Sequence, residues 1–244
     1  MCRLFGWAAP DPTAAGDLLG ADTARLRGLS HLHADGWGAA WSDGAEIHSI
    51  REEVPAHTSA QFDSAVHQGV GRLGLLHLRW ATDGLSTCSV NTHPFVRDGV
   101  AFIHNGSIPR GPVLDELIDP DLAQTLEGDT DSERYFLAVL SAVRRTGSLP
   151  EAFARVVDAL SGAAWPSLNA MWITGSTLGV LAATQPRYRA GDLPTDYYDL
   201  RYAREHATTM AWSTGVRHAS GEVLPDRHLL LVDPLAGSSQ LFGL

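Results

Sequence analysis

The order of the secondary structure elements that the sequence predicts constrains the fold of this chain most strongly. Apolar or alternating segments in the first half favour strands, two adjacent amphipathic helices follow, and the last third is again rich in strands. Strands and helices therefore do not alternate regularly, as they would in a doubly wound parallel sheet. This order predicts an α+β protein built from layers of sheet and helix.

The individual elements are predicted from apolar spacing and from turn residues. A helical face is predicted over 13–29, although Gly16 and Gly20 weaken it, and Asp43-Gly44 predicts the turn of a hairpin. A run of leucines makes 73–82 the best candidate for a buried strand. The remaining predictions are strands at 2–9, 36–42, 45–50, 100–106, 169–175, 177–185, 207–214, 228–234 and 238–244, and helices near 62–69 and at 131–145 and 151–160.

The composition is that of a globular protein, and it excludes one class of partner. The chain has 244 residues, of which 44% are hydrophobic, and we expect one domain over residues 2–244. All 18 basic residues are arginines scattered along the chain, and the formal net charge is -10. Phosphate binding needs a basic surface, so no nucleic-acid partner is expected.

The cysteine count and the first residues bear on the cellular compartment. Two cysteines, Cys2 and Cys88, argue against a disulfide scaffold. The short apolar run after Arg3 ends at Pro10 and Asp11, which is not the pattern of a signal peptide. No stretch approaches the roughly 18–20 apolar residues of a membrane-spanning helix. We therefore expect a cytoplasmic protein with a reduced Cys2 and no membrane partner.

Cys2 directly follows the start methionine, and this position has a chemical meaning. A free thiol with a pKa of about 8.5 is mostly protonated at neutral pH, so a cysteine nucleophile needs a base. Removal of Met1 would give Cys2 a free α-amine, whose pKa of about 7.7–8.0 suits that role. The alternative is that the second residue of the chain is disordered and its identity accidental.

Asn105 and Gly106 end a predicted strand and could serve a thiol nucleophile. An Asn side-chain amide and a Gly backbone N–H are suitable donors for the oxyanion that forms when a nucleophile attacks a carbonyl. The alternative is that Asn-Gly is an ordinary hairpin turn.

Two further segments offer groups for binding a charged substrate. Arg79 presents a fork that matches a carboxylate, and the hydroxyl of Thr82 could add a third donor. In the segment 128–133 an Asp or Ser could cap the following helix, and Asp131 could also bind a substrate ammonium. An acyl substrate with both a carboxylate and an ammonium is an α-amino acid, which suggests the γ-amide of glutamine.

Five motifs, taken together and in order, resemble those of class II glutamine amidotransferases of the N-terminal-nucleophile type. They are Met1-Cys2, RWAT at 79–82, NTHPF at 91–95, HNG at 104–106 and DTDSE at 129–133. The segment HADGWG at 33–38 resembles the stand-alone bacterial branch, which includes γ-glutamyl amidases. The motifs cover residues 2–133.

The resemblance implies a four-layer αββα fold and a role for each matching residue. Cys2 would be the nucleophile with its own amine as base, and Asn105 and Gly106 would form the oxyanion hole. Arg79 and Thr82 would hold the substrate carboxylate. Asp131 would hold the ammonium, Trp80 would lie beside the substrate side chain, and His93 and Asp35 would support the site. Neither a metal nor a cofactor is implied.

The chain also departs from the family pattern. Arg3 and Leu4 stand where many members have Gly and Ile, which fits the stand-alone branch better, and Asp83 stands where several have histidine. We expect no appended synthase or sugar-isomerase domain, so an ammonia acceptor would be a separate enzyme or water.

Two alternatives from other classes remain. The first is a module that senses glutamine or γ-glutamyl metabolites without turnover, although a sensor has no need of a nucleophile. The second is a metal hydrolase that uses some of the eleven histidines, but His31 and His33 are two apart and no known metal motif is present.

Overall fold

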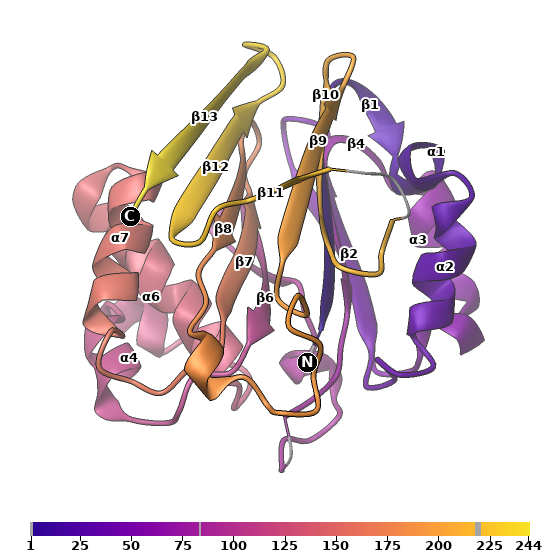
Figure 1. Cartoon of the computed structure of the whole chain (residues 1–244). Coiled ribbons are helices and arrows are strands. Elements are labelled where there is room, and N and C mark those ends of the chain that lie inside the picture. The colour runs from indigo at the N-terminus through magenta and orange to yellow at the C-terminus, as the bar shows by residue number, and fades with distance from the viewer. Residues whose placement is uncertain (1, 83, 218–220) are drawn as a thin grey trace.

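Two antiparallel β-sheets lie face to face in a computed structural model, and helices cover the outer face of each sheet (Figure 1). The structure describes residues 2–82, 84–217 and 221–244. The order of layers is helix, sheet, sheet, helix, which confirms the expected α+β fold of the αββα type.

The first sheet has β1 near its centre and carries its helices on one face. Its strands, in spatial order, are β11 (Glu222–Val223), β9 (Leu200–Glu205), β10 (Thr208–Ser213), β1 (Arg3–Ala14), β4 (Val70–Leu78), β2 (Trp37–Ser42) and β3 (Ile47–Glu52). The helices on its outer face are α1 (Ala15–Leu19), α2 (Asp22–Leu29) and α3 (Ala60–Gln68).

The second sheet contains β6 and β7 side by side and packs against the longest helices. Its strands, in spatial order, are β13 (Ser238–Gly243), β12 (His228–Asp233), β8 (Leu178–Ala182), β7 (Leu168–Ile173), β6 (Val100–Gly106) and β5 (Phe95–Arg97). The remaining elements are the helices α4 (Pro112–Leu117), α5 (Pro120–Ala123), α6 (Asp131–Thr146) and α7 (Leu149–Ala159) and the short 3₁₀ turns η1 (Ala56–Thr58), η2 (Ser89–Asn91) and η3 (Pro186–Tyr188).

Alternating side chains on the central strand explain why the first sheet is buried on both faces. Along β1, Leu4 and Ala8 pack between the two sheets, whereas Phe5 and Trp7 pack against α1–α3. All four are at most 1% exposed. Successive side chains of a strand point to opposite faces, so a run without polar residues fits a strand covered on both sides.

The structure corrects two predicted elements. The helix expected over 13–29 is present as two helices, α1 and α2. It begins later than expected because β1 continues to Ala14, and Gly20, at φ 52°, separates the two helices. The strand expected over 73–82 begins at Val70 and ends at Leu78, so residues 79–82 form a loop. The hairpin around Asp43-Gly44 and the two adjacent helices are confirmed.

The start of α6 positions a predicted site residue. The side chain of Thr130 accepts a hydrogen bond from the Glu133 N–H at 3.1 Å, so the cap is Thr130 and not the expected Asp or Ser. Capping in this way satisfies one of the free N–H groups at a helix N-terminus. Asp131 becomes the first residue of the helix.

Candidate active site

Cys2 lies at the start of the central strand β1 and faces the second sheet. Its side chain is buried with 7% exposed, and its backbone nitrogen donates to Asn105 Oδ1 at 2.8 Å. Its sulfur lies 3.8 Å from the carbonyl oxygen of Trp80. The predicted nucleophile thus contacts the predicted oxyanion residue across the two sheets. Met1 lies outside the described residues.

Asn105 and Gly106 end β6, where the strand pairs with β7. Asn105 is fully buried, and among the residues the structure describes its Nδ2 has no hydrogen-bond partner. A Cβ placed on Gly106 would overlap the carbonyl oxygen of Ser167, so only glycine fits there. Asn105 and Gly106 sit within the β6–β7 ladder opposite Asn169 and Leu168, and the alternative of a hairpin turn at this position is wrong.

One cavity brings most of the predicted site residues together. It measures about 320 Å³ including the space open to solvent. The predicted residues on its wall are Cys2, Arg79, Trp80, Thr82, Gly106 and Asp131, together with His93. Its other lining residues, which sequence reasoning did not assign, are Ala81, Leu85, Asn91, His104, Thr130 and Ser132.

Asp35 and Gly36 hold the loop that carries Arg79 and Trp80. The Arg79 N–H donates to the Gly36 carbonyl at 2.8 Å, and the Ala81 N–H donates to Asp35 Oδ2 at 2.8 Å. Gly36 has φ 122°, a conformation that side chains rarely adopt. The segment HADGWG therefore fixes the entry of the loop, and the placement of Asp35 agrees with a supporting role.

Arg79 is buried and its guanidinium is already engaged. It donates through Nη1 to the Asp35 carbonyl at 3.2 Å and through Nη2 to the Ser86 carbonyl at 3.3 Å. Five N–H donors are available on a guanidinium, so these two contacts orient the group without exhausting it.

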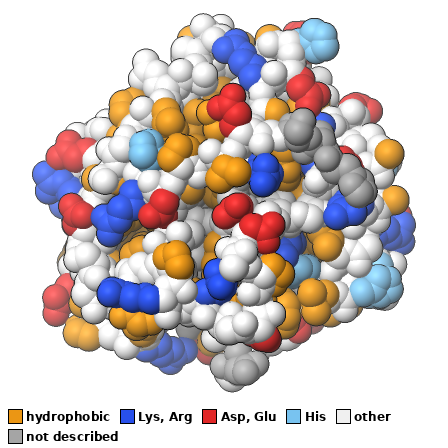
Figure 2. Space-filling view, viewed as in Figure 1, with side chains coloured by type: hydrophobic (Ala, Val, Ile, Leu, Met, Phe, Trp, Pro, Cys, Tyr) orange, Lys and Arg blue, Asp and Glu red, His pale blue; other side chains and the backbone are white. Residues whose placement is uncertain are grey.

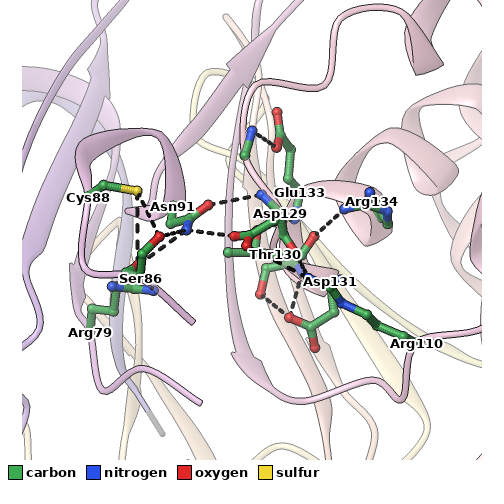
Figure 3. A network of polar contacts seen from close by, with 12 residues as sticks. Arg79, Ser86, Cys88, Asn91, Arg110, Asp129, Thr130, Asp131, Glu133 and Arg134 are labelled. Atoms are coloured by element: carbon green, nitrogen blue, oxygen red, sulfur yellow. Dashed lines mark hydrogen bonds and ion pairs between the residues drawn. The ribbon is translucent and has the colours of Figure 1, made fainter. Parts of the chain in front are cut away.

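A polar network joins the loop after Arg79 to the start of α6 (Figure 3). Asn91 Nδ2 donates to Asp129 Oδ1 at 2.7 Å and to Ser86 Oγ at 3.1 Å, and Asn91 Oδ1 accepts from the Asp129 N–H at 3.1 Å. Cys88 lies in the same loop, with Sγ 3.5 Å from Ser86 Oγ. Asn91 thereby fixes the distance between the two segments that carry Arg79 and Asp131.

The carboxylate of Asp131 also has two backbone partners. Oδ2 accepts from the Ile108 N–H at 2.5 Å, and Oδ1 accepts from the Ser132 N–H at 2.9 Å. Ser132 Oγ lies 2.9 Å from Nδ1 of His104, the residue before Asn105. A carboxylate has about four acceptor positions, so Asp131 retains capacity for a ligand in the cavity that it lines.

Two buried histidines, His93 and His104, line the cavity, and a third, His77, packs against His93. Burial lowers the pKa of His77 to about 3, places that of His93 well below its usual value and lowers that of His104. All three are therefore neutral near pH 7. Neither ring nitrogen of His93 has a partner within the described part of the chain, and its ring lies 4.1 Å from that of His77.

The other histidines that the structure describes form no metal centre. His31 stacks on His57 with ring centroids 3.8 Å apart, whereas His33 meets Trp80 edge-on at 5.7 Å. Across residues 2–82, 84–217 and 221–244, no three His, Cys, Asp or Glu side chains lie together as metal ligands would.

Tyr197 lies near Cys2 through its contact with Arg3, and the sequence did not reveal this contact. The guanidinium of Arg3 stacks 4.0 Å from the ring centroid of Tyr197, and its Nη1 donates to the Cys2 carbonyl at 3.2 Å. Burial raises the pKa of Tyr197 to about 12. No local signal connects residues so far apart in the sequence, although Arg3 already departed from the family pattern.

The chain belongs to the class II glutamine amidotransferases, because residues 1–173 match the model of that family. The glutamine–fructose-6-phosphate aminotransferase (isomerizing) of Leifsonia xyli is 32% identical over 171 residues, or 67% of this chain and 26% of that protein. A putative glutamine amidotransferase of Haemophilus influenzae is 30% identical over 154 residues, or 60% of this chain and 49% of that protein. The chain thus spans about a quarter to a half of these relatives.

Solved structures share the fold over the whole chain. A glutamine aminotransferase class-II domain protein from Silicibacter pomeroyi has a TM-score of 0.68 and 21% identity, and the match covers 99% of both chains. The glutamine phosphoribosylpyrophosphate amidotransferase of B. subtilis has a TM-score of 0.63 and 17% identity, over 99% of this chain and 49% of that one. These likenesses concern the N-terminal-nucleophile fold alone.

Charged side chains of both signs are mixed on one face of the molecule. On the face shown in Figure 2, arginines and acidic side chains are interspersed with apolar ones and form no continuous basic surface. None of the helices in the described residues has the length and apolar character needed to cross a membrane.

Proposed function

We propose that this protein hydrolyses the γ-amide of glutamine or of a γ-glutamyl compound through a thioester on Cys2. The observation that carries the proposal is the arrangement of Cys2 and Asn105. Asn105 Oδ1 accepts from the Cys2 nitrogen at 2.8 Å, and this contact leaves the buried Nδ2 without a partner among the described residues. A buried donor without an acceptor is costly, and an oxyanion formed beside Cys2 would supply one.

The reaction follows from the groups around Cys2. After removal of Met1, the α-amine takes the thiol proton and the sulfur attacks the amide carbonyl carbon. A C–S bond forms, the C–N bond breaks, and the departing amine takes the proton from the α-ammonium. Water then gives a proton to the α-amine and attacks the thioester. A C–O bond forms, the C–S bond breaks, the sulfur takes the proton from the α-ammonium, and glutamate is released. Asn105 Nδ2 and the Gly106 N–H stabilise the negative oxygen in both steps.

The remaining residues of the cavity hold the amino acid end of the substrate. Arg79 and Thr82 bind the α-carboxylate, Asp131 binds the α-ammonium, and Trp80 lies beside the aliphatic part. No step needs a metal or a cofactor. We assign the whole activity to one domain, residues 2–244. The released ammonia either enters the solvent or is taken up by a separate acceptor enzyme.

The test is glutamate release from glutamine and from γ-glutamyl amides by protein whose mature N-terminus is verified by intact mass. We expect turnover only from protein that has lost Met1, because only that form has the α-amine. Full activity with Met1 retained would overturn the role of the amine. Tight binding of glutamine without any release of glutamate would instead favour the sensing module.

A further inference from the structure

A second, wider cavity continues from the wall of the Cys2 cavity. It measures about 1070 Å³ including the space open to solvent, and it shares Trp80, Ala81 and Thr82 with the cavity around Cys2. Its other lining residues are Ser107, Ala164, Pro166, Tyr188, Ala190, Asp192, Leu193 and Tyr198. Most of its far wall therefore comes from the connection between β8 and β9, beyond the residues that match the family model.

This connection is held beside the nucleophile by contacts from three strands. Asn169 of β7 donates through Nδ2 to the Tyr198 carbonyl at 2.5 Å. Arg3 of β1 stacks on Tyr197, and Thr214, just after β10, donates to the Tyr197 carbonyl at 3.2 Å. In Figure 1 the connection crosses the lower edge of both sheets and passes close to the N-terminal end.

The electrostatics of Tyr198 agree with a place beside Cys2. Burial is the main cause that raises the pKa of the Tyr198 phenol, and its neighbours Tyr197 and Cys2 add to the effect. Arg3 contacts both Tyr197 and the Cys2 carbonyl, and the two cavities share Trp80, Ala81 and Thr82. A group on the amide nitrogen of a substrate that extends past Trp80 therefore enters the wide cavity.

The lining determines which leaving groups fit. Trp80, Tyr188 and Tyr198 supply aromatic surface, and Pro166 and Leu193 supply apolar surface. Asp192 carries the one charge among the described lining residues, and it is negative. Pockets for small organic molecules have this composition, largely apolar and aromatic with a few polar groups. Ammonia needs no such space, and a carboxylate on the leaving group would meet Asp192.

We propose that the wide cavity binds the leaving group of the substrate, and that this leaving group is an alkylamine that carries an aromatic ring and no negative charge. The inference rests on the proposed function and gives it a substrate class, the γ-glutamyl amides of such aralkylamines. Trp80 lies on both walls and separates the glutamyl part from the amine. The reaction is the one given above, with the aralkylamine taking the proton as the C–N bond breaks.

Four substrates test the inference: glutamine, γ-glutamyl ethylamide, γ-glutamyl phenethylamide and γ-glutamylphenylalanine. We expect kcat/KM for the phenethylamide to exceed that for the ethylamide by about tenfold or more, the gain expected from burying one aromatic ring. γ-Glutamylphenylalanine has the same ring and an added carboxylate, and we expect it to be at least several-fold poorer than the phenethylamide.

Two variants assign the effect to this wall. Tyr188→Ala should remove most of the preference for the phenethylamide and leave glutamine hydrolysis unchanged, because Tyr188 lines only the wide cavity, and Tyr188→Phe should keep the preference. Asp192→Asn should raise kcat/KM for γ-glutamylphenylalanine and leave the phenethylamide unchanged.

The outcomes separate this inference from the proposed function. If glutamine is hydrolysed but the phenethylamide is no better than the ethylamide, the inference is wrong and the cavity faces something else, such as an acceptor protein. The same holds if Tyr188→Ala leaves the preference intact. If neither glutamine nor any amide is hydrolysed, the proposed function is wrong and the inference falls with it.

Discussion

The backbone nitrogen of Cys2 lies 2.8 Å from Oδ1 of Asn105, although 103 residues separate the two in the sequence. This contact determines which way the Asn105 amide points, because its oxygen is engaged and its nitrogen must face the other way. Cys2 therefore orients the amide group that the proposed reaction uses as an oxyanion donor.

Replacement of Asn105 by alanine tests this donor. We expect Asn105→Ala to lower kcat for glutamine hydrolysis by about 10²–10³-fold with a small change in KM, because an oxyanion donor acts on charge that develops in the transition state. Steady-state kinetics of glutamate release measure both constants. A change confined to KM would mark Asn105 as a ground-state contact instead.

Substitution of each cysteine in turn tests which of the two is the nucleophile. Cys2→Ala should abolish turnover and leave the fold intact, whereas Cys88→Ala should change activity little, since the sulfur of Cys88 lies against Ser86 of its own loop. A glutamine analogue with an electrophilic group should label Cys2 alone in peptide mass mapping. Label on Cys88, or an active Cys2→Ala protein, contradicts the assignment.

Gly106 gives a prediction about stability. A Cβ there would overlap the Ser167 carbonyl, so Gly106→Ala should lower the free energy of unfolding by about 1–3 kcal/mol or more, as overpacking does. The matched control is Gly28→Ala in α2, where no atom lies within 4 Å of an added Cβ. That change should be neutral or should stabilise the protein by up to about 1 kcal/mol. Denaturant unfolding compares the two, and equal effects would refute the close approach at Gly106.

Asp131 is tested by removing the charge on either side of the proposed contact. Asp131→Asn should lower kcat/KM for glutamine by about ten- to a hundredfold, the value of one charge-assisted contact. Because asparagine keeps an oxygen acceptor, one of the backbone contacts of residue 131 can persist. The des-amino analogue lacks the ammonium and should be insensitive to the substitution. An equal loss with both substrates would show that Asp131 only organises the start of α6.

The buried histidines predict the direction of acid sensitivity. Burial holds the pKa of His77 near 3, whereas the unfolded chain binds this proton near pH 6.5. The folded state binds fewer protons between these values, so stability is complete above pH 6.5 and falls as the pH drops toward 3. His77 alone accounts for up to about 2 kcal/mol at pH 5.

His77→Gln separates this effect from other acid effects. A glutamine amide can still donate to the His104 carbonyl, which lies 3.2 Å from His77 Nε2. We expect the variant to lose less stability than the wild type between pH 7.5 and pH 5, as measured by denaturant unfolding at both values. A loss as large as that of the wild type would show that His77 does not contribute.

The sequence predicts those parts of the site whose chemistry demands a residue type. Three residue types alone carry these predictions. Cys2 predicts a nucleophile beside a free amine, Arg79 a group for a carboxylate, and Asp131 a partner for an ammonium. The strands around them follow from apolar spacing, because the sheets are covered on both faces. The predicted helix ends are less accurate. Gly20 interrupts a predicted helix, and Thr130 caps α6 in place of the expected Asp or Ser, because a break or a cap depends on the conformation of one residue.

The rest of the site depends on contacts with no signature in the chain. Arg3 meets Tyr197, and Asn169 holds Tyr198, only because the strands bring them to the same edge. Asn91 and Asp129 each begin a motif that the sequence analysis names, but only the fold shows that the two bond to each other. Such pairs follow from the tertiary structure, so spacing along the sequence carries no information about them.

Asn105 and Asn169 are directly opposite each other in the β6–β7 ladder, and they serve different halves of the site. Asn105 holds Cys2, and Asn169 holds the end of the β8–β9 connection, whose beginning is fixed by the bridge between Ser167 and Thr184. The intervening segment 185–196 therefore spans two fixed points. Under the proposed function, loops of other lengths and compositions in this place would change which amines are accepted and leave the chemistry of Cys2 constant, so specificity and catalysis would evolve independently on this framework.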